Sequence, residues 1–253
     1  MKKDNLFDYY LSEKDKPFKG WDFSYVSETG RMQSGLISWS YGSFVRPFVQ
    51  KSNAMLDMGT GGGEFLSRMQ PFPKETYATE AYLPNVSVAK ERLGPIGVKV
   101  VQIEEDSDLP FEDNQFDLIM NKHEAYSPAE IRRIISENGI FVTQQVGGLN
   151  DAEINDRLGA PVNDEFSHWN LEFAVGELIN HSFEVTYKLE EYPVERFYDV
   201  GALVYYLQAI PWQIPDFNVN KYCDKLYTIH QEILQVGYFE VKQHRFMLKA
   251  RPI

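Results

Sequence analysis

A glycine-rich turn after a short apolar run is the feature of this sequence best suited to bind a ligand. The apolar run 54–56 precedes the carboxylate of Asp57, and glycines follow at positions 59, 61, 62 and 63. Glycine permits the tight turn and the close approach of backbone to ligand that a strand-to-helix junction makes in nucleotide-binding folds. The segment therefore predicts a ligand that is held largely by backbone atoms.

The residues after the glycines limit the kind of ligand. Glu64 stands where the dinucleotide-binding pattern Gly-x-Gly-x-x-Gly requires Gly or Ala, and a count begun at Gly61 puts Leu66 there instead. The Gly-Lys-Ser/Thr of a phosphate-binding loop is missing as well. A carboxylate at a helix start repels a pyrophosphate, because both favour the same positive helix end. The loop thus predicts a nucleoside-like ligand without phosphate.

Composition limits the class of protein. The chain has 253 residues, a net charge of -12 and a pI near 4.9, which disfavours a broad basic surface for nucleic acid but leaves room for a local basic cleft. Cys223 is the only cysteine, so an intrachain disulfide and a cysteine metal site are excluded, and no metal is expected. The first residues lack a signal-peptide pattern and no apolar run approaches a membrane span, so we expect a cytoplasmic protein without membrane contact.

From residue 54 onward, short apolar runs alternate with helix-like stretches. Ser127-Pro128-Ala129-Glu130 is a capping box with proline at the first helical position, and Gly139 stands where that helix would stop. The alternation predicts an α/β fold, a doubly wound, mostly parallel sheet with helices on both faces. The predicted strands lie at about 54–58, 76–80, 98–103, 116–121 and 139–145, and the predicted helices near 63–70, 84–93 and 128–137.

The two ends of the chain have a different character. Residues 1–50 are so rich in aromatic side chains that we expect them to pack on the core rather than to form a free tail. We predict a domain at 51–253 that carries a helical insert at about 192–237, preceded by the aromatic extension 1–50. The late elements expected are a helix near 168–180, a strand near 183–190, helices at about 197–209 and 219–236, and a last strand at about 239–249.

Polar side chains follow the predicted strands where each strand ends, which is the edge at which doubly wound sheets bind ligands. Glu80 ends the second strand, at a distance from Asp57 that suits one strand–helix–strand passage. A carboxylate in this place can accept hydrogen bonds from both hydroxyls of a ribose. Glu105 and Asp106 follow the third strand, and residues 121–124 follow the fourth.

The order of these motifs over about residues 52–147 resembles the class I S-adenosylmethionine-dependent methyltransferases. The resemblance implies a seven-stranded sheet whose last strand is antiparallel, and S-adenosyl-L-methionine as the cofactor. The motifs that carry it are, in chain order, Asp57-x-Gly59-x-Gly61-x-Gly63, Glu80, Glu105-Asp106-x-x-Leu109-Pro110-Phe111 and Phe116-Asp117-Leu118-Ile119.

The resemblance also implies roles for the residues around the glycine loop. The backbone of the loop 59–63, which includes Gly59, Thr60, Gly61 and Gly63, would lie against the methionine part of the cofactor. Asp57 would order this loop, and Glu80 would hold the ribose hydroxyls.

The later motif residues would contact the other parts of the cofactor. Glu105 stands where the family usually has an Asp that reads the adenine amino group, and the backbone N–H of Asp106 would meet the adenine ring. Asn121 would lie beside the methionine moiety and the methyl group. The Glu at position 105 is a departure from the family pattern.

Methyl transfer needs the acceptor in line with the methyl group and, for a protonated acceptor, a base. His123 follows the fourth strand near the expected acceptor and is the candidate general base, since its ordinary pKa suits neutral pH. A loop histidine without a catalytic role is the alternative. Tyr126 is a candidate substrate contact in the same loop.

The aromatic extension supplies further candidates for the substrate side of the pocket. Such extensions often close the pocket of this fold, so Trp21, Tyr25, Arg31 and Trp39 are candidates to line a lid. The alternative is that these aromatic side chains only pack the core.

The leading hypothesis is therefore a methyltransferase that acts on a small-molecule acceptor. Base methylation of ribosomal or transfer RNA is the close alternative, and a non-catalytic S-adenosylmethionine-binding protein is a hypothesis from another class. A nicotinamide dehydrogenase is disfavoured by Glu64. Both a monomer and a homodimer fit the sequence.

Overall fold

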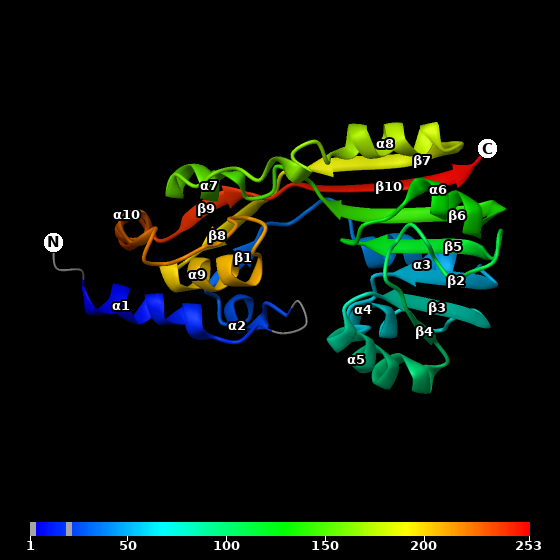
Figure 1. Ribbon diagram of the computed structural model, residues 1–253, viewed down its shortest axis with the longest axis horizontal. Helices are drawn as coiled ribbons and strands as arrows, with labels where there is room; N and C mark the ends of the chain where they lie inside the picture. The colour runs from blue at the N-terminus through cyan, green and yellow to red at the C-terminus, as the bar shows by residue number, and fades with distance from the viewer. Residues whose placement is uncertain (1–3, 19–21) are drawn as a thin grey trace. The chain divides into compact units, whose positions relative to one another are not determined.

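The computed structural model describes residues 4–18 and 22–253, which form two compact units (Figure 1). The first unit contains Met1–Ile37, Gly147–His168 and Glu191–His244. The second unit contains Ser38–Val146, Trp169–Glu190 and Arg245–Ile253. The first division falls between residues 37 and 38, earlier than the expected end of the aromatic extension at 50.

The second unit is built on a seven-stranded sheet in the order β4-β3-β2-β5-β6-β10-β7. The pairs from β4 through β6 are parallel, and β10 runs antiparallel to β6. The expected fold class, a mostly parallel sheet whose last strand is antiparallel, is confirmed. The strands span Ala54–Met58 (β2), Glu75–Glu80 (β3), Lys99–Gln102 (β4), Phe116–Lys122 (β5), Ile135–Val146 (β6), Phe183–Glu191 (β7) and Arg245–Pro252 (β10).

Helices cover this sheet and bury its apolar side chains. Side chains of α8, among them Leu178, share one buried cluster with Phe246 and Leu248 of β10, and α5 packs against β4 (Figure 1). The Ser127 hydroxyl accepts from the Glu130 N–H, as the capping-box sequence predicts. The helices span Tyr41–Val49 (α3), Glu64–Ser67 (α4), Leu83–Leu93 (α5), Pro128–Ile134 (α6) and Leu171–Asn180 (α8), with a 3-10 turn at Gly94–Ile96 (η2).

Two expected boundaries are wrong. The helix expected at 128–137 ends at Ile134, and Gly139 lies inside β6 instead of stopping a helix. The register between β5 and β6 shifts before Ile140, so the glycine accompanies an irregularity of the strand. The expected last strand 239–249 is two strands in different sheets, β9 (Phe239–Lys242) and β10.

The first unit combines helices with a small antiparallel sheet in the order β1-β8-β9, which the sequence pattern did not indicate because its strands are very short. Helix α9 is buried along nearly its whole length, at the centre of this unit's apolar cluster. In the part of the chain that the structure describes, no helix is long and apolar enough to cross a membrane. The remaining elements are Asn5–Leu11 (α1), Ser12–Asp15 (η1), Ser24–Ser27 (α2), Met32–Ser34 (β1), Ala152–Leu158 (α7), Asp164–Phe166 (η3), Val194–Phe197 (β8), Val200–Ala209 (α9) and Cys223–Val236 (α10).

Helix α3 is joined to the sheet through one buried hydroxyl. The Tyr41 hydroxyl accepts from the Asn121 N–H at 3.1 Å and lies 3.0 Å from the Asn121 carbonyl and 3.2 Å from the Val142 carbonyl. The hydroxyl therefore contacts backbone groups of both β5 and β6 near the carboxyl end of the parallel strands. An unsatisfied buried N–H is costly, so this hydroxyl fixes both strands near their ends.

Replacing Tyr41 with Phe should destabilise the second unit by about 1–3 kcal/mol, because the Asn121 N–H loses its buried partner. Amide hydrogen exchange measures this directly, since exchange at Asn121 should accelerate more than exchange elsewhere in β5. Tyr9→Phe, at an exposed tyrosine of α1, is the matched control and should change neither quantity. Unchanged protection of Asn121 in Tyr41→Phe would contradict the role given to the hydroxyl.

Candidate active site

The glycine loop joins β2 to α4 in the conformation that its sequence predicts. Gly59, Gly61 and Gly63 have φ angles of 62°, 61° and 80°, in the left-handed region that favours glycine. The Thr60 N–H donates to the Thr79 carbonyl at 2.9 Å, which ties the loop to β3. The loop therefore lies at the carboxyl ends of β2 and β3, where a doubly wound sheet binds its ligands.

Glu64 has a partner in the neighbouring helix α5. Arg92 forms an ion pair with the Glu64 carboxylate and donates to the Gly62 carbonyl. The arginine thus holds the far side of the glycine loop. Both side chains keep solvent-exposed surface, so the pair organises the loop more than it stabilises the fold.

Asp57 is a buried carboxylate at the end of β2. Burial raises its pKa to about 7, while Thr60 and the positive charge of Lys122 act in the opposite direction. Close to neutral pH this group therefore exchanges between its charged and uncharged forms. A cation placed at the glycine loop would favour the charged form.

Two further carboxylates lie near the loop. Glu80, buried at the end of β3, accepts from the Tyr82 N–H at 2.8 Å. Asp106 has one buried oxygen, Oδ1, without a hydrogen-bond partner among the described residues. Burial and then the negative charge of Glu80 raise the pKa of Asp106 to about 6. Buried oxygens normally accept a hydrogen bond, and a ligand could supply the donor for this one.

Glu124 also belongs to this group, whereas the sequence indicated only its place after the fourth predicted strand. A Cβ atom at Gly59 would collide with the Glu124 side chain, so this side chain lies directly against the glycine loop. Burial and then the negative charges of Asp106 and Glu80 raise the pKa of Glu124 to about 7. The hydrogen bond from the Ala125 N–H acts in the opposite direction. The signal available in the sequence was an acidic residue two positions beyond the end of β5.

Glu105 and Asp106 differ in where their side chains lie. Glu105 is exposed and its carboxylate accepts from the Ser107 hydroxyl at 3.1 Å. Asp106, one residue later, carries the inward oxygen and is close enough to Glu80 to sense its charge. The carboxylate that could read a ligand is therefore that of Asp106, where the sequence had suggested Glu105.

Asn121 is fully buried and uses its side chain to hold the loop after β5. Its Oδ1 accepts from the Thr143 hydroxyl at 2.9 Å and from Gln145 Nε2 at 2.7 Å. Its Nδ2 donates to the Ala125 carbonyl at 3.2 Å. Asn121 thus positions the loop that bears His123 and Glu124, rather than offering free polar atoms to a ligand.

His123 begins this loop in a left-handed conformation, with a φ angle of 62°. The backbone N–H of His123 donates to the Gln144 carbonyl at 2.8 Å, and the ring Nε2 lies 2.9 Å from Gln144 Nε2. Desolvation and then the positive charges of Arg245 and Lys122 lower the pKa of His123. The residue keeps exposed surface, which limits the desolvation, but both cations act in the same direction.

The aromatic candidates of the second unit pack against the sheet. Trp39 is buried and donates from Nε1 to Gln144 Oε1 at 2.8 Å. Tyr126 packs edge-on against Phe141 and Trp169, and its buried hydroxyl has no partner among the described residues. Burial and then the negative charge of Glu177 raise the pKa of Tyr126 above its ordinary value.

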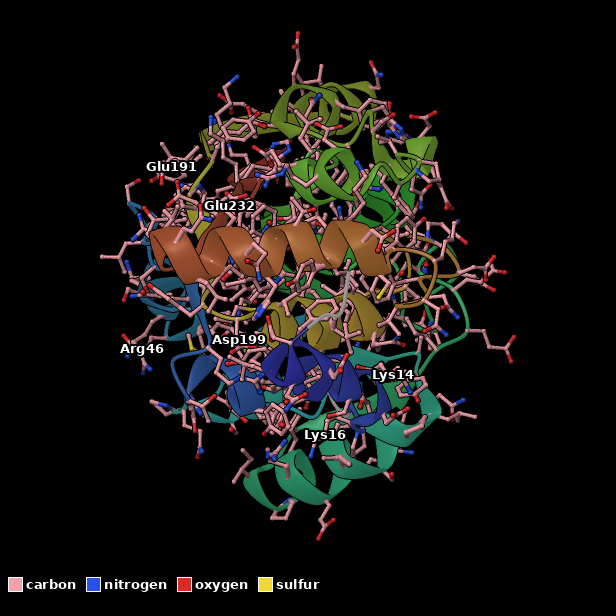
Figure 2. All side chains as sticks on the ribbon, turned by 90° about the vertical axis from the view of Figure 1, so that its left-hand side faces the viewer. Lys14, Lys16, Arg46, Glu191, Asp199 and Glu232 are labelled. Carbon is pink, nitrogen blue, oxygen red and sulfur yellow. The ribbon has the colours of Figure 1, made fainter. Side chains whose placement is uncertain are left out.

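The remaining substrate candidates belong to the first unit or lie outside the described residues. Trp21 is outside them. Arg31 donates twice to Asp199, which precedes α9 (Figure 2), at 2.8 Å each, and once to Glu13 at 3.1 Å. The Tyr25 hydroxyl donates to the same Glu13 at 3.0 Å. Arg31 and Tyr25 therefore have structural partners within their own unit.

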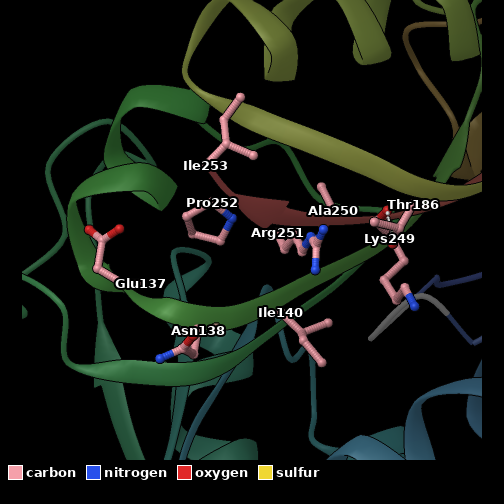
Figure 3. A pocket seen from close by; sticks show the side chains of 10 residues that line it. Glu137, Asn138, Ile140, Thr186, Lys249, Ala250, Arg251, Pro252 and Ile253 are labelled. Carbon is pink, nitrogen blue, oxygen red and sulfur yellow. Dashed lines mark hydrogen bonds between the residues drawn. The ribbon is translucent and has the colours of Figure 1, made fainter.

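A surface hollow of about 410 Å³ lies at the other edge of the second unit's sheet (Figure 3). It is lined by the first residues of β6 and the last residues of β10, and Thr186 donates to the Lys249 carbonyl beside it. This is the amino-terminal edge of the parallel strands, whereas ligands of such sheets bind at the carboxyl ends. The glycine loop, rather than this hollow, is the candidate site.

Comparison with known proteins agrees with this choice. Residues 56–143 match the methyltransferase domain family. This range contains the glycine loop, Glu80 and the pair Glu105-Asp106. A search of curated protein sequences gives no match.

Three solved structures share the fold at low sequence identity. A Bacillus halodurans protein with a provisional methyltransferase description has 17% identity and a TM-score of 0.61, covering 85% of this chain and 100% of its own. The [4+2]-cyclase SpnF has 13% identity and a TM-score of 0.54, with coverages of 92% and 95%. Geranyl diphosphate methyltransferase in complex with S-adenosylmethionine has 12% identity and a TM-score of 0.52, with coverages of 96% and 94%.

Replacing Asp57 with Asn should stabilise the free protein at pH 8 and have little effect at pH 4.5. The folded-state pKa lies above the unfolded value, so the wild-type protein loses stability as the pH rises from about 4 to 7. At about 1.4 kcal/mol per pKa unit, the gain at pH 8 is about 1–4 kcal/mol, since Lys122 offsets part of it. Denaturant unfolding at both pH values measures the difference in unfolding free energy between Asp57→Asn and the wild type. An equal difference at both pH values would contradict the raised pKa of Asp57.

Proposed function

We propose that this chain, whose residues 56–143 match the methyltransferase domain family, binds S-adenosylmethionine at the glycine loop and transfers its methyl group. The observation that carries the proposal is the glycine loop itself, in left-handed conformation beside the buried carboxylate of Glu80. These two features lie at the carboxyl ends of the adjacent strands β2 and β3.

The charges around the loop support this cofactor. Glu80, Asp106 and Glu124 lie close enough together for their negative charges to act on one another. Asp106 Oδ1 has no hydrogen-bond donor among the described residues. S-adenosylmethionine carries a positive sulfonium, a positive ammonium and one carboxylate, so it brings a net positive charge to these groups. A dinucleotide would instead bring pyrophosphate charges to the same carboxylates.

The adenosine part has suitable partners along β3 and the segment after β4. The Glu80 carboxylate would accept from the ribose hydroxyls, and Asp106 Oδ1 from the adenine amino group. Tyr82 and Leu83 follow Glu80 with 61% and 64% of their surfaces exposed, so they offer apolar area to the face of the adenine ring. The Glu124 side chain lies directly against the Gly59 backbone, so the methionine part would meet both.

The bound cofactor supplies a methyl group on a sulfonium, which is already a good leaving group. The chain then needs to position an acceptor in line with the methyl group and to exclude water. We propose a small molecule as the acceptor, because the net charge of -12 opposes the broad phosphate contacts of RNA.

Replacing Glu80 with Ala should weaken S-adenosylmethionine binding by about 1.5–3 kcal/mol for each charge-assisted hydrogen bond to the ribose that is lost. Titration calorimetry measures the affinity, and the same titration with NADH should show no binding. Glu75→Ala is the matched control, because Glu75 begins the same strand and pairs with Lys99 at the protein surface.

An unchanged affinity in Glu80→Ala would remove Glu80 from the site. Binding of NADH but not of S-adenosylmethionine would overturn the proposed function. Release of S-adenosylhomocysteine in the presence of an acceptor would establish turnover, which binding alone leaves open.

The affinity for S-adenosylmethionine should rise by about 10- to 100-fold from pH 5.5 to pH 7.5, at about 1.4 kcal/mol per pKa unit. The pKa values of Asp106 and Glu124 are raised to about 6 and 7, so both carboxylates gain negative charge over this interval. A cationic ligand binds the charged forms better. S-adenosylhomocysteine lacks the sulfonium charge and should show a much smaller change.

Calorimetry with both ligands at the two pH values separates this effect from a general loss of structure. Glu124→Gln should remove most of the difference between the ligands. Glu112→Gln, at an exposed carboxylate before β5, should keep it. Parallel pH dependence for both ligands would show that the carboxylates do not sense the sulfonium.

A further inference from the structure

The segment between β4 and β5 carries Asp106 and is hydrogen-bonded to other elements on either side of it. On the first side, the Ile103 N–H donates to the Glu80 carbonyl of β3 at 3.2 Å. Residues 104–108 form no hydrogen bond with another element in the part of the chain that the structure describes. The place of Asp106 therefore depends on the anchors that flank these five residues.

The second anchor is the backbone of Leu109 and Phe111, which two side chains of α6 hold. Glu130 Oε1 accepts from the Leu109 N–H at 2.7 Å. Arg133 donates to the Leu109 carbonyl at 2.9 Å and to the Phe111 carbonyl at 2.7 Å. The side chains of Leu109 and Phe111 are buried in the second unit's apolar cluster. Burial thus keeps Leu109 in the core, and the hydrogen bonds fix the direction of its peptide groups.

Glu130 and Arg133 also hold one another in a two-pronged ion pair. Arg133 Nε donates to Glu130 Oε2 at 3.0 Å, and Arg133 Nη2 donates to Glu130 Oε1 at 2.5 Å. Arg133 Nη1 lies 2.9 Å from Asp113 Oδ1, which fixes the other end of the guanidinium. The hydrogen bonds from Arg133 lower the pKa of Glu130, so the pair stays charged at neutral pH.

The capping-box sequence at the start of α6 therefore has a second use. In a capping box the Glu side chain normally accepts from the N–H of the N-cap residue. Here the Ser127 hydroxyl accepts from the Glu130 N–H, while the Glu130 carboxylate turns to Leu109 and Arg133. The carboxylate thus serves a residue 21 positions earlier in the chain, at the end of the segment that carries Asp106.

We propose that Arg133 and Glu130 are positioning residues that direct Asp106 toward the adenine amino group of the cofactor, and that they thereby determine the selectivity for adenine. The inference rests on the proposed function, in which Asp106 accepts from that amino group. Asp106 Oδ1 is buried and has no partner among the described residues, so its direction follows that of the segment. Arg133 and Glu130 contact the backbone of Leu109 rather than the ligand, and they act through this segment.

The test compares S-adenosylhomocysteine with S-inosylhomocysteine, which carries an oxygen in place of the adenine amino group. At pH 8 the Asp106 carboxylate is charged, so this oxygen would face a second acceptor. Titration calorimetry of the wild type should show S-inosylhomocysteine binding about tenfold more weakly or worse, the equivalent of one charge-assisted hydrogen bond. Arg133→Gln should reduce this preference to about threefold or less, because the Leu109 and Phe111 carbonyls lose their donor.

The preference is a ratio of two affinities, so a loss of folded protein lowers both affinities and leaves the ratio unchanged. Arg133→Lys should retain part of the preference, since an ammonium can still donate to Glu130 and to one carbonyl. Asp106→Asn should abolish it, because an amide can accept from one ligand and donate to the other. Arg132→Gln is the matched control on the same helix. Arg132 pairs with Glu137 at 2.9 Å, and its replacement should leave the preference unchanged.

The outcomes separate the two proposals. Equal affinity of the wild type for both ligands, or a full preference retained in Arg133→Gln or in Asp106→Asn, would overturn the positioning role. Should Arg133→Gln not fold, an undiminished preference in Arg133→Lys would overturn it equally. In each of these cases S-adenosylhomocysteine still binds, so the proposed function stands. Absence of S-adenosylhomocysteine and S-adenosylmethionine binding to the wild type would overturn the proposed function itself.

Discussion

The structure depends most on the negative charges that gather at the carboxyl ends of β2, β3 and β4 and after β5. Burial and mutual repulsion raise the pKa values of Asp106 and Glu124, and burial alone raises that of Asp57. The fold must hold these groups together, through the parallel strand ends and the glycine loop, although they repel one another. A cationic ligand relieves the repulsion, so the same arrangement that weakens the free protein strengthens its complex.

Positive side chains lie at the same edge of the sheet as these carboxylates. The acidic groups lie at the ends of β2 and β3, after β4 and at Glu124, whereas Lys122 ends β5, where its positive charge acts on Asp57, and Arg245 begins β10. Asn121 and Gln144 hold the loop between the two groups with side chains that are hydrogen-bonded to the protein. The position of Glu124 is therefore set by hydrogen bonds that the protein itself supplies to the loop after β5.

The sequence predicted the parts of the site that depend on local backbone geometry. The glycine loop and Glu80 lie at strand ends because apolar runs and turn residues determine both. The choice between Glu105 and Asp106, and the contact of Glu124 with Gly59, depend on side-chain directions that tertiary packing sets. The division of the expected last strand into β9 and β10 was equally hidden, since strand propensity does not specify which sheet a segment joins.

The place of β10 affects how the chain acquires its fold during synthesis. In the order of the sheet β10 lies between β6 and β7, although it follows both in sequence. Until residues 245–252 leave the ribosome, β7 has no partner in the sheet and the edge of β6 is unpaired. The second unit therefore completes its sheet only after the whole of the first unit has been translated.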